Sequence, residues 1–126
     1  MQQTRLCLKA HDELFIIDLP RVLYMQADDH YAHIYYTSGG HFMVPQGLAR
    51  IEALMAELDA DTSYMVRMGR KYIVNVSRIF RVSTVREQLF LADDHGSNVT
   101  LHIPKNILRQ YLDQLDATLY PKDTQV

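Results

Sequence analysis

Apolar and polar residues alternate in short runs along the first third of the chain, which predicts β-strands joined by tight turns. Segment 5–17 holds two apolar runs around a polar HDE sequence, a pattern typical of a hairpin. The apolar run at 22–25 leads to a polar loop tip at 28–30. Aromatic and branched residues at 31–37 and the run at 41–44 then flank a Ser-Gly-Gly turn, which predicts a second hairpin.

The periodicity changes after the second hairpin. Apolar residues recur at helical spacing over 47–58, which predicts an amphipathic helix. A second helix is expected to begin at Pro104, because proline fits a first helical turn, and its apolar stripe extends to Leu119. We expect the tail 120–126 to be frayed. Strand patterns lie between the helices at 64–66, 72–74, 79–82, 89–91 and 99–101, with a polar turn at 93–98.

These elements predict a mainly β fold with small helices, in which the sheets are antiparallel and one helix lies mid-chain and one near the end. The length of 126 residues predicts one domain, 1–126. Cys7 is the single cysteine, so an internal disulfide is excluded, which fits a protein from a reducing compartment. We expect the Cys7 side chain to be buried and to pack as a small apolar group. No signal peptide or apolar stretch of about 18 residues is present, which indicates a soluble, cytoplasmic protein without a membrane span.

Positive charge is concentrated in one region, although the whole chain carries a net charge of −2. No Asp or Glu lies between Asp61 and Glu87. A solvated surface normally mixes both signs, whereas a surface that meets phosphates gains from excluding anions. We therefore favour nucleic acid as the partner. The cations in this gap are Arg67, Arg70, Lys71, Arg78, Arg81 and Arg86.

The stretch DDHYAH at 28–33 has the composition of a metal site. His30 and His33 would share one face of a helix, but on a strand their side chains point to opposite faces. Tyr31 and Tyr35 would then lie with His33 on one face. Because the segment reads as a strand, we favour a surface loop with an exposed imidazole over a metal site.

Catalytic motifs are absent from the sequence. There is no Gly-x-Ser-x-Gly elbow and no glycine-rich loop that opens a helix. Asp28 and Asp29 could suggest a phosphoacceptor pocket, but that fold needs a parallel sheet of alternating strands and helices. We expect neither enzymatic activity nor a cofactor.

The order of motifs over residues 14–115 resembles the LytTR-type DNA-binding domain, the output domain of bacterial LytR/AgrA-like response regulators. The most specific element is YIVNVSRI at 72–79, and the helix sequence VTLHIPKNILRQYL at 99–112 also fits. The resemblance implies elongated antiparallel sheets with small helices. It also implies that loops enter successive major grooves of promoter DNA.

Three contact regions follow from the resemblance by position. They are the loop tip at His30, the turn with Arg70 and Lys71, and the helix start at Lys105. Lys105 stands where the family often has arginine. An ammonium group, which acts as a point charge, therefore replaces a guanidinium that could make two parallel hydrogen bonds. Asn75 is interpreted as a structural cap. We assign phosphate contacts to Arg67, Arg78 and Arg109, and core positions to Tyr72, Ile73, Val74, Ile79 and Val82.

The resemblance implies a transcription regulator that binds double-stranded promoter DNA, as a homodimer on paired sites. In typical members a receiver domain, which an upstream histidine kinase phosphorylates, precedes this DNA-binding domain, whereas only about 13 residues precede the match here. The initial Met favours a stand-alone regulator over an excised domain. Three alternatives remain open. They are a protein-interaction or signalling module that keeps the fold without DNA binding, a metal enzyme at 28–33, and a single-strand binder that stacks bases on Tyr31, Tyr35, Tyr72 or Phe80.

Overall fold

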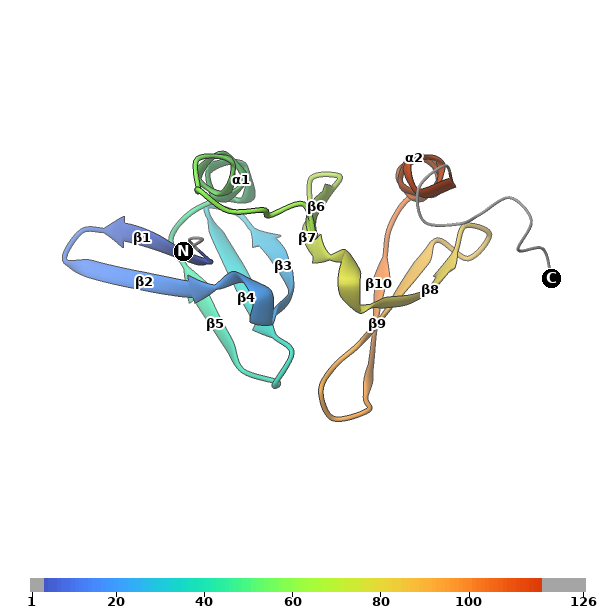
Figure 1. Cartoon of the computed structure of the whole chain (residues 1–126), viewed down its shortest axis with the longest axis horizontal. Coiled ribbons are helices and arrows are strands. Elements are labelled where there is room, and N and C mark those ends of the chain that lie inside the picture. Colours follow the sequence, from blue (N-terminus) through green and yellow to red (C-terminus); the bar gives the residue numbers. More distant parts are fainter. Residues whose placement is uncertain (1–3, 117–126) are drawn as a thin grey trace.

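Three antiparallel sheets and two helices make up the protein in the computed structural model, which describes residues 4–116 (Figure 1). Two short 3-10 turns, Leu19–Arg21 and Val76–Arg78, join strands. The predicted mainly β fold with small helices is confirmed. The elements are β1 (Arg5–Ala10), β2 (Glu13–Asp18), β3 (Val22–Asp28), β4 (Tyr31–Tyr36), β5 (His41–Val44), α1 (Leu48–Ala56), β6 (Met65–Met68), β7 (Tyr72–Asn75), β8 (Ile79–Ser83), β9 (Gln88–Ala92), β10 (Asn98–His102) and α2 (Lys105–Asp116).

A five-stranded sheet with the order β5-β4-β3-β7-β6 forms the centre of the molecule. Its middle strands are covered on both faces, which is why residues 22–25 of β3 and 72–75 of β7 are all buried. The hairpin β1–β2 and the three-stranded sheet β10-β9-β8 are separate sheets. Figure 1 shows the two larger sheets side by side, with α1 near the first and α2 near the second.

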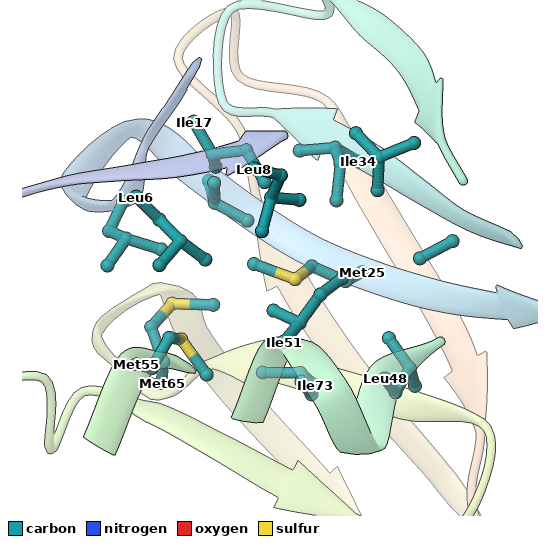
Figure 2. Packing of buried hydrophobic residues seen from close by; sticks show 14 residues of the cluster. Leu6, Leu8, Ile17, Met25, Ile34, Leu48, Ile51, Met55, Met65 and Ile73 are labelled. Atoms are coloured by element: carbon teal, nitrogen blue, oxygen red, sulfur yellow. The ribbon is translucent and has the colours of Figure 1, made fainter. Parts of the chain in front are cut away.

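The first core lies between the β1–β2 hairpin, α1 and one face of the five-stranded sheet (Figure 2). Leu8 and Ile17 reach it from the hairpin, Ile51 from α1, and Met25 and Ile73 from the central strands. Their side chains are almost fully removed from solvent. Burying each large aliphatic side chain contributes roughly 1.5–3 kcal/mol.

The second core lies on the opposite face of the same sheet and joins it to the three-stranded sheet and α2. Tyr72 and Val74 point into it from β7, Leu89 and Leu91 from β9, and Leu108 from α2. Strands β3, β6 and β7 each send side chains into both cores, so these strands join the two halves of the molecule.

The sequence-based element assignments agree closely with the structure. Helix α1 begins one residue later and ends two residues earlier than the predicted range 47–58, and its N-cap is Gly47. The Asn75 side chain accepts a hydrogen bond from the Ser77 amide, which confirms its role as a cap. Ile79 and Val82 are half-buried against the second core. Leu119 and the tail 120–126 lie outside the described residues.

The expectation that Cys7 is buried is wrong. On β1 the side chains of Leu6 and Leu8 face the core, so strand alternation places Cys7 between them on the solvent side. Its register partner is Ile16, which is also exposed. No helix within residues 4–116 is long and apolar enough to cross a membrane.

Candidate nucleic-acid interface

The turn between β6 and β7 presents Arg70 and Lys71 to solvent. Gly69 has a φ of +74°, a left-handed conformation that glycine adopts without a steric penalty. Lys71 lies with its Nζ 5.5 Å from the centroid of the Tyr72 ring. Within residues 4–116, neither Arg70 nor Lys71 has a carboxylate oxygen within salt-bridge distance of its side chain. The turn therefore offers two exposed cations.

The turn between β3 and β4 lies at the same end of the five-stranded sheet. Antiparallel pairing matches Gln26 with Tyr72, and the Ala27 amide donates to the Lys71 carbonyl at 2.8 Å. Asp28 ends β3, and His30 follows at the tip of the turn with a side chain that is 90% exposed. This agrees with the prediction of an exposed imidazole in a surface loop.

The start of α2 forms the third part of this edge. A groove of about 600 Å³ separates it from the β6–β7 turn and is lined by apolar side chains that include Met68, Ile103 and Ile107. A Cβ added at Gly69 would lie 2.8 Å from Ile107 Cδ1, so the turn and the helix are closely packed. Lys105 and Arg109 are exposed and are spaced four residues apart, on one face of the helix.

The structure therefore brings together His30, Arg70, Lys71 and Lys105, with Arg109 one helical turn further along α2. We call this set the cationic edge. Three segments that are far apart in the sequence contribute to it, and all its side chains are exposed.

Among the arginines and lysines of the predicted contact set, which all lie within residues 4–116, Arg67 and Arg78 are the two with a carboxylate partner at salt-bridge distance. His30 Nε2 also lies 3.6 Å from a carboxylate oxygen, Asp29 Oδ1. The expectation that the cations have no nearby anions is wrong for both arginines. Arg67 Nη1 lies 3.3 Å from Glu52 Oε1 on α1, and Arg78 Nη2 lies 2.9 Å from Asp94 Oδ1. Arg78 follows β7, so it lies at the opposite end of that strand from the β6–β7 turn.

A hydrogen-bonded row of side chains lies behind the β3–β4 turn. His33 Nε2 is 2.9 Å from Asp28 Oδ2, and His33 Nδ1 is 2.8 Å from His41 Nε2. The His41 ring stacks on Tyr35, which stacks on Tyr24 at 4.4 Å between centroids. This row links three strands and braces the base of the turn.

Tyr24 is the most buried member of that row. Burial, with smaller contributions from Tyr35 and Tyr72, raises the pKa of Tyr24 to about 12. The Tyr24 phenol therefore stays protonated at neutral pH.

The aromatic side chains considered for single-strand binding do not form one platform. Tyr72 is buried, and Tyr35 lies between the rings of Tyr24 and His41. Tyr31 and Phe80 are about half exposed, but they belong to different sheets. The favoured surface is therefore the cationic edge rather than an aromatic one.

Two carboxylates that shape this region were missed from the sequence. Glu52 pairs with Arg67, and Glu87 Oε2 accepts a hydrogen bond from the Lys105 amide at 2.7 Å, which caps the start of α2. Glu87 has a φ of +54° and also accepts the Ile103 amide through its carbonyl. The sequence around Glu52 and Glu87 does not indicate either contact, because the two residues lie 15 and 18 positions along the chain from the groups that they bind.

Asp94 joins the two larger sheets at the end opposite the cationic edge. A hydrogen bond from Thr37 at 2.9 Å, with help from Arg78, lowers the pKa of this carboxyl from its ordinary value of 3.8.

The folded protein thus binds the Asp94 proton less tightly than the unfolded chain does. We expect the resulting stability to be fully present above pH 3.8 and to be lost as the pH falls through the lower folded value. Thermal melts between pH 2 and pH 6 check this, because Asp94→Asn should remove part of the acid dependence. An unchanged dependence in that variant would contradict the assignment.

Comparison with known proteins identifies a family and a similar fold. The sequence profile of the LytTr DNA-binding domain matches residues 12–118. The fold is similar to the solved LytTr DNA-binding domain of a protein from Bacillus cereus, described as a methyl-accepting/DNA response regulator. That comparison has a TM-score of 0.60 and 20% sequence identity, and it covers 91% of this chain and 98% of that one. A search of curated proteins gave no match. The profile covers most of the chain, and the chain therefore belongs to the LytTR family of DNA-binding domains.

Proposed function

We propose that this protein binds double-stranded DNA with sequence preference and regulates transcription. The observation that carries the proposal is the cationic edge, in which the β6–β7 turn and the start of α2 present exposed cations next to the exposed His30 imidazole of the β3–β4 turn. Loops and helix ends of this kind can enter a groove, where base edges are read, while other cations contact phosphates.

The members of the edge take different roles in this proposal. Arg70 reads a base edge, because its guanidinium can donate two parallel hydrogen bonds to guanine O6 and N7. His30, Lys71 and Lys105 reach base edges or the adjacent backbone, and Arg109 contacts a phosphate. The assignment of Arg67 and Arg78 as phosphate contacts stays a prediction. Each already pairs with a carboxylate, which offsets part of its attraction for phosphate.

The setting is proposed from the family resemblance. We propose that residues 1–126 act as one DNA-binding unit in the bacterial cytoplasm and bind paired promoter sites as a homodimer. A receiver domain or histidine kinase outside this chain would supply the signal. Gel filtration with light scattering, with and without a duplex that carries paired sites, measures the dimer. A strictly monomeric 1:1 complex would contradict that part.

Selection of bound duplexes from a random pool tests sequence preference directly. We expect enrichment of one motif, and tighter binding to it than to a shuffled duplex by a factor of about 10³ or more in fluorescence anisotropy. Competition with single-stranded DNA of the same sequence should be weak. Equal binding to all duplexes would reduce the proposal to non-specific DNA binding.

Salt dependence provides a second prediction, because each phosphate contact releases condensed counterions. We expect log K for the preferred duplex to fall linearly with log salt concentration, and Lys105→Ala to reduce the slope by about 1. Lys9→Ala is the matched control, because Lys9 is exposed on β1, away from the edge. A slope that is equal in both variants would exclude Lys105 from the contact set.

A protein-interaction module that keeps the fold without binding DNA is the second candidate. It is favoured by the carboxylates of Asp28 and Asp29 beside His30, and by the ion pairs of Arg67 and Arg78. Acidic groups at the edge repel phosphates and lower DNA affinity. A shallow salt dependence and no enriched motif in the random pool would support this second function.

A further inference from the structure

The Arg67 side chain folds back along the β6–β7 turn. Its Nε donates to the Gly69 carbonyl at 2.7 Å, and its Nη2 donates to the Arg70 carbonyl at 3.4 Å. Its Nη1 donates to Glu52 Oε1 at 3.3 Å, and the side chain is only 23% exposed. One guanidinium thus links two carbonyls of the turn to a carboxylate on α1.

The turn needs such support because of its position and conformation. β6 is an edge strand of the five-stranded sheet, so the turn has a neighbouring strand on only one side. Gly69 has a left-handed backbone and no side chain of its own, so apart from the close approach of Ile107 the turn depends on contacts from neighbouring side chains. A planar guanidinium has donors on three nitrogens in a fixed fork, so it can bind several acceptors at once, whereas the ammonium of lysine is a point charge.

We infer that Arg67 is a positioning residue for the turn that carries Arg70 and Lys71, and that Glu52 holds it in place. This inference rests on the proposed function, in which Arg70 reads a base edge. It replaces the phosphate contact that the sequence assigned to Arg67. Three of the five N–H donors of Arg67 already bind protein acceptors, and these hydrogen bonds hold the mostly buried guanidinium against the turn rather than toward solvent. Through Glu52, helix α1 also supports the reading turn.

Arg67→Lys separates the two roles, because it keeps the charge and loses the fork. A phosphate contact would survive this change and leave the preference for the selected duplex intact. A positioning residue would not. We expect the affinity ratio of preferred to shuffled duplex to fall by about tenfold, the cost of ordering roughly one more residue on binding. Arg67→Gln should lower this ratio by a similar factor. Arg50→Lys, at an exposed site on α1, is the matched control and should leave the ratio unchanged.

NMR of the free protein tests the positioning role without DNA. In Arg67→Lys we expect lower ¹⁵N heteronuclear NOE values at residues 69–71 than in the wild type, with the rest of the five-stranded sheet unchanged. An equally ordered turn in the variant would overturn the inference, whether or not the protein binds DNA. If the turn is disordered in Arg67→Lys but the wild-type protein shows no sequence preference for DNA, the inference stands and only the proposed function is contradicted.

Glu52→Ala tests the second contact by comparison with Glu57→Ala. Both changes remove one exposed carboxylate from the region of α1, so their general electrostatic effects on DNA binding should be similar. If Glu52 holds Arg67 in place, Glu52→Ala binds the preferred duplex about twofold to threefold more weakly than Glu57→Ala. If Arg67 contacts a phosphate, Glu52→Ala frees it and binds more tightly than Glu57→Ala, which would overturn the inference. Equal affinities would overturn the part assigned to Glu52.

Discussion

Arg70→Ala is expected to weaken binding to the preferred duplex by about 1–3 kcal/mol, which is roughly a fivefold to 150-fold loss. The side chain is exposed at the tip of a turn that Arg67 and the Gly69–Ile107 contact hold in place. Because the backbone of the turn is already held, binding does not have to order it, and more of the hydrogen-bond energy is available for recognition. Anisotropy titrations against the selected motif and all single-base variants measure the loss.

The pattern across variant sites matters more than the size of the loss. If Arg70 reads one base pair, Arg70→Ala removes discrimination at that position and leaves the other positions unchanged. Arg86→Ala removes the same charge from an exposed site in the β8–β9 turn, outside the proposed contact set. It should weaken all duplexes slightly and equally. A uniform loss in Arg70→Ala as well would make Arg70 a backbone contact.

Local pattern was sufficient to predict the elements of this fold. The Gly-Gly turn, the helical spacing over 47–58 and the proline before α2 depend on neighbours within a few residues, and each feature is confirmed. The loop tips at His30 and Arg70 were predicted for the same reason. Strand pairing then brought these tips to one end of a sheet, because antiparallel β3 and β7 meet at Gln26 and Tyr72.

Local pattern could not predict which charges have partners. The sequence gap without acids suggested an unpaired strip, but Glu52 and Asp94 approach Arg67 and Arg78 from other elements. The exposure of Cys7 also depends on residues that are far away in the sequence. An apolar run predicts a strand, but the solvent-facing side is set by what covers it, and the β1–β2 hairpin is packed on one face.

Asn75→Ala is expected to lower the free energy of unfolding by about 2–4 kcal/mol. The Asn75 side chain is 1% exposed, its Nδ2 donates to the Val22 carbonyl at 2.8 Å, and its Oδ1 accepts from the amide and hydroxyl of Ser77. Backbone pairing between β3 and β7 ends at Tyr24 and Val74, so this side chain continues the link toward the start of β3. Alanine would leave a buried carbonyl without a donor, which costs about 1–3 kcal/mol, and would remove a cap worth about 1 kcal/mol.

Urea denaturation of Asn75→Ala and Ser77→Ala separates these contributions. Ser77→Ala removes only the hydroxyl that lies 2.6 Å from Oδ1, at an exposed residue, so it should cost less than about 1 kcal/mol. Asn75 lies at the opposite end of β7 from the cationic edge. Folded Asn75→Ala should therefore bind DNA with nearly wild-type affinity at low temperature. If both variants lost the same stability, the bond to Val22 would contribute nothing, and packing alone would join β7 to β3 at that end.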